Sequence, residues 1–269
     1  MGFHQLRVED LDSLRARAHH YCAKANRPVP SPELAEHLFS GDQPEDGVSP
    51  LLIRALLRRD DRFHEMRRGT WEVVDARYHG VPLERARFAV VDLEATGSNP
   101  RSDHIIEVGV VVVEGLEVTA RYSSLVNPLV RIPSWIRRLT GIDEAKLQDA
   151  PRFHQIAPEI MQHLEGAVFV AHNVDFDYPF LRSHLRAVDH EPPPWPQLCT
   201  LRLARKTLRG LPSYRLDAIA KHCGIDLDRH HRAIADAEAT AGVLLRMVSQ
   251  LRESGVETVG ELLSASNGR

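Results

Sequence analysis

The chain has 269 residues, a formal net charge of −3 at pH 7 and 43% hydrophobic residues. This length and composition predict a globular protein with one large or two smaller domains, and they exclude a disordered or fibrous chain. The small net charge gives no general attraction for polyanions, so any binding of nucleic acid depends on local basic patches or on bound cations.

The sequence contains no run of apolar residues long enough for a membrane span, and its N-terminal stretch MGFHQLRVEDLDSLRARAHH carries charges where a signal peptide has an apolar core. We therefore expect a cytoplasmic protein. The three cysteines lie far apart and form no Cys-x-x-Cys pair. Neither a disulfide framework nor a zinc ribbon is expected.

Residues 1–84 are expected to form a separate small domain. Apolar positions at helical spacing over residues 6–25, and the helix-start signals Ser31 and Ser49, predict three helices. Gly69 separates an arginine pair from the segment WEVV, which predicts a small hairpin. Three helices followed by a hairpin are the outline of a winged helix.

The segment LLRRDDRFHEMRRGTWEVVD resembles the last helix and wing of the HARE-type winged-helix domains. The resemblance implies a small α+β domain of a kind that often binds DNA. Four arginines would supply the positive charge: Arg58, Arg59, Arg67 and Arg68. Because an arginine cluster is also common on a solvated surface, DNA binding and docking to a protein both stay open.

The remainder of the chain has a different pattern. Continuous apolar runs at residues 88–91, 105–113 and 167–171 predict strands that are buried on both faces, and a further strand is expected over residues 118–126. Helical segments dominate the rest. Strands that come first and helices that are interleaved later predict an α/β layer fold.

Two acidic residues, Asp92 and Glu94, end the first predicted strand. Side chains alternate along a strand, so residues two apart project from the same face and both carboxylates can face one metal ion. Two acids can also simply mark the solvated end of a strand. The pair alone does not decide between these interpretations.

A second acidic cluster follows the predicted strand at residues 167–171, in the segment AHNVDFDYPFL. Asp177 falls at the start of a helix, where it fits the position of a third ligand. Asp177 and Asp175 could instead stabilise the positive end of the helix dipole, with Pro179 in the first turn. Both explanations are open from this segment alone.

A third cluster, HHRAIADAEATA, begins polar and becomes a helix of small residues that can lie close against a sheet. Asp236 projects from this helix. His231 precedes it by five positions, about 140° away on a helical wheel, so the two cannot share a helix face. We therefore expect His231 in the loop before the helix, where its imidazole can meet a water molecule.

The three clusters together resemble the exonuclease motifs of the DEDDh family of 3′-5′ exonucleases: DLEATG, HNVDFDYPFL and HRAIAD. The resemblance covers residues from about 85 to 250. LTGI and CTLRLARKTLRGLPSYRLDAIAKHCGI are similar to segments of the branch that contains the epsilon proofreading subunit of DNA polymerase III. The family implies a ribonuclease H-like fold, with a central mixed sheet flanked by helices, over residues 85–252, and leaves 253–269 as a C-terminal tail.

The resemblance also implies the roles of the site residues. Four carboxylates would bind two divalent metal ions, Mg²⁺ or Mn²⁺: Asp92, Glu94, Asp177 and Asp236. His231 would be the general base, because the spacing from His230 to the last Asp departs from the family pattern. Asp175 is displaced from the motif position and should not be a ligand. Oxygen ligands suit these hard cations better than zinc.

In the family the backbone after the Glu meets the terminal 3′ hydroxyl, which corresponds here to Ala95, Thr96 and Gly97. A glycine at this point permits close approach of backbone. Other candidates for contact with the terminal nucleotides are Leu93, Asn173, Phe176 and Tyr178. For the apolar and aromatic residues of this set, ordinary core packing is an equally good explanation.

The expected function is hydrolysis of phosphodiester bonds from the 3′ end of DNA, at single-stranded or frayed ends, with release of nucleoside 5′-monophosphates. A DNA polymerase or a repair complex is a possible partner. An RNA-directed exoribonuclease has the same site, because contacts to the 2′ hydroxyl are not visible in the sequence. A non-catalytic nucleic-acid-binding adaptor and a structural protein with surface acids are further alternatives.

Overall fold

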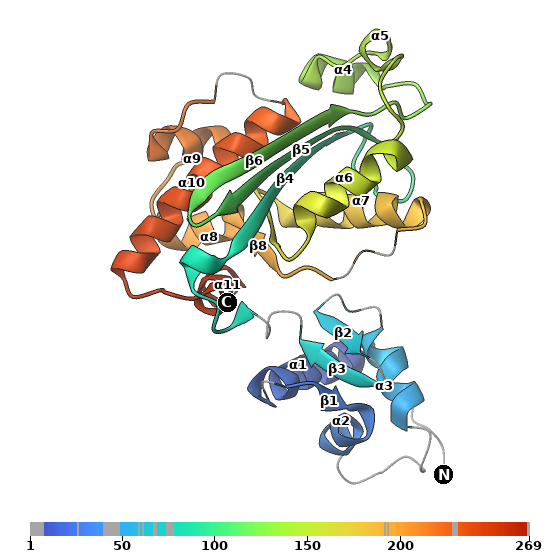
Figure 1. The fold of residues 1–269 in the computed structure, drawn as a ribbon, viewed down its shortest axis with the longest axis vertical. Coiled ribbons are helices and arrows are strands. Elements are labelled where there is room, and N and C mark those ends of the chain that lie inside the picture. The colour runs from blue at the N-terminus through green and yellow to red at the C-terminus, as the bar shows by residue number, and fades with distance from the viewer. Residues whose placement is uncertain are drawn as a thin grey trace. The chain divides into compact units, whose positions relative to one another are not determined.

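The computed structural model describes residues 8–25, 27–39, 49–58, 60, 62–66, 69–73, 78–190, 192, 194–227 and 231–267. The chain forms two compact units (Figure 1). One comprises Met1–Gly80 with Pro193–Pro196, and the other comprises Val81–Pro192 with Gln197–Arg269. No helix in the described ranges is long and apolar enough to cross a membrane.

Within its described residues, the N-terminal unit contains three helices and a three-stranded antiparallel sheet of order β1-β3-β2. The elements are α1 (Val8–Ala25), β1 (Val29–Pro30), α2 (Ser31–Leu38), α3 (Ser49–Leu57), β2 (Phe63–Met66) and β3 (Thr70–Val73). The three helices and the hairpin occur where the sequence predicts them. The winged-helix assignment and the ligand of this unit stay predictions. Of the four arginines, Arg58 is exposed, whereas Arg59, Arg67 and Arg68 lie outside the described residues.

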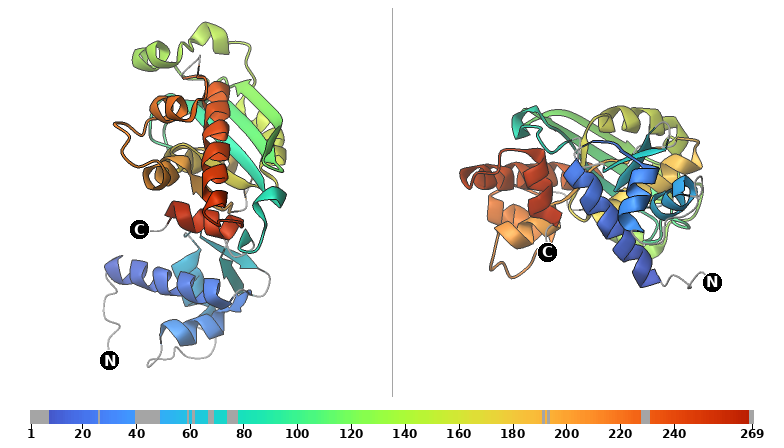
Figure 2. Two further views of the ribbon diagram at one scale, coloured as in Figure 1. Left: turned by 90° about the vertical axis from the view of Figure 1, so that its left-hand side faces the viewer. Right: turned by 90° about the horizontal axis from the view of Figure 1, so that it is seen from below.

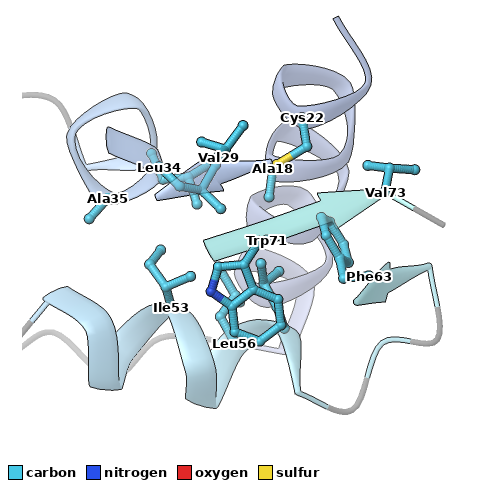
Figure 3. Packing of buried hydrophobic residues seen from close by; sticks show 12 residues of the cluster. Ala18, Cys22, Val29, Leu34, Ala35, Ile53, Leu56, Phe63, Trp71 and Val73 are labelled. Atoms are coloured by element: carbon cyan, nitrogen blue, oxygen red, sulfur yellow. The ribbon is translucent and has the colours of Figure 1, made fainter. Parts of the chain in front are cut away.

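Trp71 lies at the centre of the core of this unit (Figure 3). Its indole N–H donates to the Ser31 hydroxyl at 3.0 Å, and that hydroxyl donates to the Gly69 carbonyl at 2.7 Å. Burial raises the pKa of the Cys22 thiol to about 11. A thiol with this pKa stays protonated at neutral pH and acts as a packing group.

The second unit contains a five-stranded mixed sheet of order β6-β5-β4-β7-β8 (Figure 1). Its strands are β4 (Arg87–Ala95), β5 (Ile105–Glu114), β6 (Glu117–Leu125), β7 (Val168–Ala171) and β8 (Gln197–Cys199). The first three pair antiparallel, and β7 and β8 run parallel to β4. The apolar run at residues 88–91, which predicts a strand buried on both faces, lies in the central strand β4.

Helices cover both faces of this sheet (Figures 1 and 2). On one face lie α6 (Phe153–Leu164) and α7 (Val174–Ala187), and on the other lies α10 (Ala233–Glu253), which packs against α8 (Thr200–Thr207) and α9 (Leu216–Cys223). A 3₁₀ turn at Leu83–Arg85 precedes the sheet, and α4 (Ser134–Thr140) and α5 (Glu144–Leu147) connect β6 to α6. The α/β fold with a central mixed sheet flanked by helices is confirmed.

Small residues let α10 approach the sheet. Ala233, Ala237 and Ala241 are fully buried, and the helix contacts β4 and β5. Gly109 of β5 faces the start of the helix, because a Cβ at this position would lie 2.4 Å from the Ala233 carbonyl carbon. The predicted close contact between the small-residue helix and the sheet is therefore confirmed, and it depends on a glycine in the neighbouring strand.

Residues 253–269, expected to be a tail, contain the helix α11 (Val259–Asn267). Val259, Leu262 and Leu263 are buried, and the helix packs against α8 and β8. The Ser266 hydroxyl donates to the Cys199 carbonyl at 3.3 Å. This segment is therefore part of the hydrophobic core of the second unit.

Candidate active site

A cavity of about 550 Å³ lies where the ends of three elements meet: the strand β4 and the helices α7 and α10. His231 lines this cavity. The four carboxylates that the sequence singles out line it as well: Asp92, Glu94, Asp177 and Asp236. Two of the acids come from one strand and the other two from the first turns of two helices. The fold thus brings together acids that are far apart in the sequence.

Strand β4 positions two of these acids and also holds a third. Asp92 and Glu94 project from the same face, because side chains alternate along a strand. The backbone N–H of Leu93 donates to Oδ1 of Asp177 at 3.1 Å. Asp177 is only 4% exposed, and this hydrogen bond fixes it beside the strand.

The turn before α10 places His231 next to Asp236. His231 has a φ of 64°, in the left-handed region, and its backbone N–H donates to Oδ2 of Asp236 at 2.9 Å. The helix begins at Ala233, so the predicted loop position of His231 is confirmed. Ligand atoms of Glu94, His231 and Asp236 lie within 4.8 Å of one another. His230 lies outside the described residues.

A fully buried carboxylate that the sequence analysis missed, Glu107, anchors this turn. It lies on β5 directly across from Glu94. Its carboxylate accepts hydrogen bonds from Arg232 at 2.8 and 3.1 Å and from the Ala233 backbone N–H at 3.1 Å. The start of α10 is thereby tied to the sheet at the cavity. A single glutamate inside the apolar run IIEVGVVVV is the signal that could have identified this residue, since buried carboxylates are rarely unpaired.

Burial and mutual repulsion raise the pKa values of the cavity carboxyls. The pKa of Asp92 is well above its ordinary value, first because of burial and then because Asp177 and Asp236 are close. Burial, followed by Asp236 and Glu107, raises the pKa of Glu94 to about 8. Burial also raises the pKa of Asp177 to about 8, although the hydrogen bond from Leu93 opposes the shift. These acids are therefore costly to ionise without a counter-charge.

A family model described as exonuclease matches residues 89–244, a range that contains all four cavity carboxylates and His231. The chain belongs to the exonuclease family. The match includes α7 and those parts of β4 and α10 that carry the cavity carboxylates. The family assignment and the site geometry thus concern the same part of the chain.

Relatives and solved structures agree with the exonuclease family. The DNA polymerase III subunit epsilon of Aquifex aeolicus is 36% identical over 164 residues, which are 61% of this chain and 81% of that protein. A PolC-type DNA polymerase III from Caldanaerobacter subterraneus is 37% identical over 181 residues, which are 66% of this chain and 13% of that protein. The structure of exonuclease X in complex with 5′ overhanging duplex DNA has a TM-score of 0.52 and 25% identity, and covers 67% of this chain and 99% of that chain.

The shared region is only a part of several larger relatives. It amounts to 13% of the PolC-type protein and to 19% of the 3′-5′ exonuclease DinG of Bacillus subtilis, which is 35% identical. The family model begins at residue 89 and so does not extend over Met1–Gly80, which makes up most of the N-terminal unit. The comparisons therefore concern the exonuclease unit.

The donor set of the cavity fits hard divalent cations. Carboxylate oxygens predominate, and they are buried together with raised pKa values, so a cation would relieve both their repulsion and their desolvation. Zinc sites usually draw on cysteine or several histidines, whereas His231 is the one imidazole in the described cluster of candidate ligands. This exonuclease site is suited to oxygen-preferring metals.

The raised pKa values predict that the metal-free protein loses stability as the pH rises. The folded protein holds protons on these carboxyls more tightly than the unfolded chain does. The stabilisation is complete below their ordinary pKa of about 4 and is lost as the pH approaches about 8. In EDTA we expect the melting temperature to fall between pH 5 and pH 9, and Mn²⁺ should restore it at the alkaline end, where no protons compete.

Thermal unfolding of the wild type and of Glu94→Gln measures this effect, since the variant removes one of the repelling charges and isolates the contribution of the site. In a domain of this size each kcal/mol corresponds to about 2–4 °C. Asp175→Asn is the matched control, because Asp175 is exposed and paired with Arg202. Equal pH dependence in all three proteins would contradict the prediction.

The residues expected to contact the substrate have different environments. Leu93, Asn173 and Phe176 line the cavity, as that role requires. Tyr178 does not: it is 3% exposed, packs edge-on against Phe169 and accepts a hydrogen bond from Arg182, so core packing is the correct explanation for this residue.

The segment after Glu94 lies beside the cavity. In the part of the chain that the structure describes, the lining includes none of Ala95, Thr96 and Gly97. Thr96 exchanges hydrogen bonds with the backbone of His104. A Cβ on Gly97 would lie 2.4 Å from an oxygen of Asp103, so the missing side chain makes room for that carboxylate. Contact between this backbone and a substrate stays a prediction.

Sequence analysis also missed one part of the cavity lining, which comes from the residue after β7, from α8 and from the connection between α8 and α9. It includes His172, Arg205, Tyr214 and Arg215. Arg205, Tyr214 and Arg215 fall in the segment CTLRLARKTLRGLPSYRLDAIAKHCGI, and His172 is the first residue of HNVDFDYPFL, but the sequence analysis assigns none of them a role at the site. Only the packing of α8 and α9 brings them to the carboxylates.

Proposed function

We propose that the chain is a 3′-5′ exonuclease that removes nucleoside 5′-monophosphates from single-stranded or frayed 3′ ends of DNA. The observation that carries the proposal is the convergence of four carboxylates and His231 in one cavity. Relatives named 3′-5′ exonuclease and DNA polymerase III subunit epsilon support the direction and the polymer. A neighbouring structure, exonuclease X, is described in complex with DNA.

Asp92, Glu94, Asp177 and Asp236 would hold two divalent cations, Mg²⁺ or Mn²⁺. When bound, such ions neutralise the charge that develops in phosphodiester hydrolysis and stabilise the attacking and leaving oxygens. The protein contributes the positions of these acids, which are fixed by the Leu93 N–H and by the turn at His231.

His231 acts as the general base that accepts the proton of the attacking water. Its ligand atom lies within 4.8 Å of those of Glu94 and Asp236, so it reaches the space where that water must stand. Leu93, Asn173 and Phe176 line the same cavity and bound the space for the terminal nucleotide. A base of this kind contributes about 10²- to 10⁴-fold to the rate.

An RNA-directed exoribonuclease is the nearest alternative, because a site of this type can hydrolyse either polymer. The N-terminal unit would serve to target the enzyme, as a winged-helix-like domain that binds DNA or a partner such as a polymerase or repair complex. A non-catalytic adaptor is less well supported, since every carboxylate of the motif set is present in the cavity. The cytoplasmic location stays a prediction.

Digestion of 5′-labelled DNA and RNA oligonucleotides, single-stranded and duplex, tests the proposal. We expect a ladder of products shortened from the 3′ end in Mg²⁺ or Mn²⁺, none in EDTA, and faster cleavage of single-stranded DNA. A circular single-stranded DNA is the control, because an exonuclease requires an end. Cleavage of the circle, or no cleavage of any substrate by the wild type, would refute the proposed function.

A further inference from the structure

Two arginines line the same cavity as the carboxylates, Arg205 on α8 and Arg215 at the start of α9. Both are exposed, so their guanidinium groups can meet a ligand from solvent. The lining thus combines a region of four acidic side chains with a region of positive charge. The phosphate groups of a nucleic-acid backbone would contact both regions. They would meet the acids through bound cations and the arginines directly.

The connection that carries Arg215 is held in place by hydrogen bonds. The Tyr214 hydroxyl donates to the Leu208 carbonyl at 2.8 Å, which closes the loop between α8 and α9. The Tyr214 carbonyl lies 3.2 Å from Nε2 of His172, and Nδ1 of the same imidazole lies 3.2 Å from the Thr200 hydroxyl. One histidine thus joins the loop, the start of α8 and the end of β7, so the arginines stand on a fixed wall of the cavity.

Two neighbouring arginines are neutralised by acidic partners. Arg205 and Arg215 differ from them in this respect. Arg202 pairs with Asp175, and Arg232 pairs with the buried Glu107. Within the described ranges Arg205 has no hydrogen bond or ion pair. Arg215 lies 3.8 Å from an oxygen of Asp217, and both of these side chains are more than half exposed, a contact of little energetic value. Two guanidinium groups at the cavity are therefore available for an anionic ligand.

We infer that Arg205 and Arg215 bind phosphodiester groups of the nucleic-acid strand on the 5′ side of the bond that is cleaved, an inference that rests on the proposed function. Guanidinium groups bind phosphate oxygens through paired charge-assisted hydrogen bonds. Contacts of this kind position the strand without reading its bases. They act on DNA and RNA alike, and the 3′ end enters the cavity with its backbone held in register.

The test compares Arg205→Gln, Arg215→Gln and the double variant of the full chain with Arg209→Gln. Arg209 is an exposed arginine in the connection that follows α8 and does not line the cavity, so this control loses the same charge outside the cavity. With a single-stranded oligothymidylate we expect each cavity variant to raise KM about tenfold, which is the effect of losing one hydrogen bond to a charged group. The change in kcat should be much smaller. The slope of log kcat/KM against log salt should fall by about 0.7 for each arginine removed.

A second substrate separates failure of this inference from failure of the proposed function. The p-nitrophenyl ester of thymidine 5′-monophosphate contains a phosphodiester but no upstream phosphate. The ratio of kcat/KM for the oligonucleotide to that for this ester should fall about tenfold in each cavity variant. Wild type that cleaves both substrates, with cavity variants that match Arg209→Gln in KM and in salt slope, would overturn the inference alone.

Binding provides a readout that does not depend on turnover. The Kd of a fluorescent oligothymidylate for the full chain is measured by anisotropy in Ca²⁺ at several salt concentrations. We expect the double variant to bind more weakly than Arg209→Gln, with a smaller salt slope. Equal affinity of these two proteins would overturn the inference, whether or not the wild type hydrolyses DNA.

Discussion

Asp92→Ala is expected to abolish the divalent-dependent shortening of DNA from its 3′ end, with a fall in kcat of at least about 10³-fold. Asp92 lies on the central strand and interacts with the carboxylates of both helices, Asp177 and Asp236. Its loss removes a proposed metal ligand from the middle of the set. The rate of shortening of a 5′-labelled oligonucleotide at saturating Mg²⁺ and Mn²⁺ measures the effect.

A stability measurement distinguishes this loss from unfolding. Because Asp92 is one of several buried acids that repel one another, we expect Asp92→Asn to melt at a higher temperature than the wild type in EDTA at pH 8. Asp175→Ala is the matched control, since this acid lies on the same helix as Asp177 and is exposed. An Asp92→Ala variant that retains a tenth of the wild-type rate would contradict the assigned role.

His231→Asn is expected to lower kcat by about 10²- to 10⁴-fold while the protein still binds Mn²⁺. Asparagine is the informative replacement, because His231 has a φ of 64° and asparagine adopts the left-handed region more readily than alanine does. The backbone N–H that holds Asp236 is then preserved. Loss of rate follows from loss of the imidazole alone.

The pH profile of kcat shows whether His231→Asn has lost a general base. An imidazole base gives the wild type an acid limb near neutral pH, and the variant should lack this limb. His222→Asn is the control, because His222 is exposed on α9 and does not line the cavity. A variant that loses Mn²⁺ binding together with activity would indicate that His231 is a ligand and not the base.

The sequence was sufficient to predict the α/β fold of the exonuclease unit and some of the residues that line its cavity, among them the four carboxylates and His231. The carboxylates lie at strand ends and helix starts, and these positions are determined by local patterns: the apolar run before Asp92, the strand before Asp177 and the small-residue helix after His231. Local patterns of this kind depend on residues that are close in sequence.

Features that depend on packing between distant elements could not be predicted in this way. Glu107 and Gly109 matter because β5 lies beside β4 and faces the start of α10. Arg205 and Arg215 reach the cavity only because α8 and α9 pack against α10. For Gly97, a small residue was expected to make room for the substrate, whereas the available space is taken by Asp103. Which group fills the space beside a small residue depends on tertiary packing.

The first turn of α10 supplies the last cavity carboxylate, and the residue before Arg232 is the proposed base, whereas Asp92 and Glu94 belong to the first strand of the exonuclease unit. During translation, a ribosome must therefore make nearly the whole unit before any complete hydrolytic site can form. A truncated product that ends before His231 but after α7 would retain three of the acids, but it would lack the proposed base and the helix that contacts β4 and β5. The proposed hydrolytic activity would thus arise only after the first turn of α10 has been made.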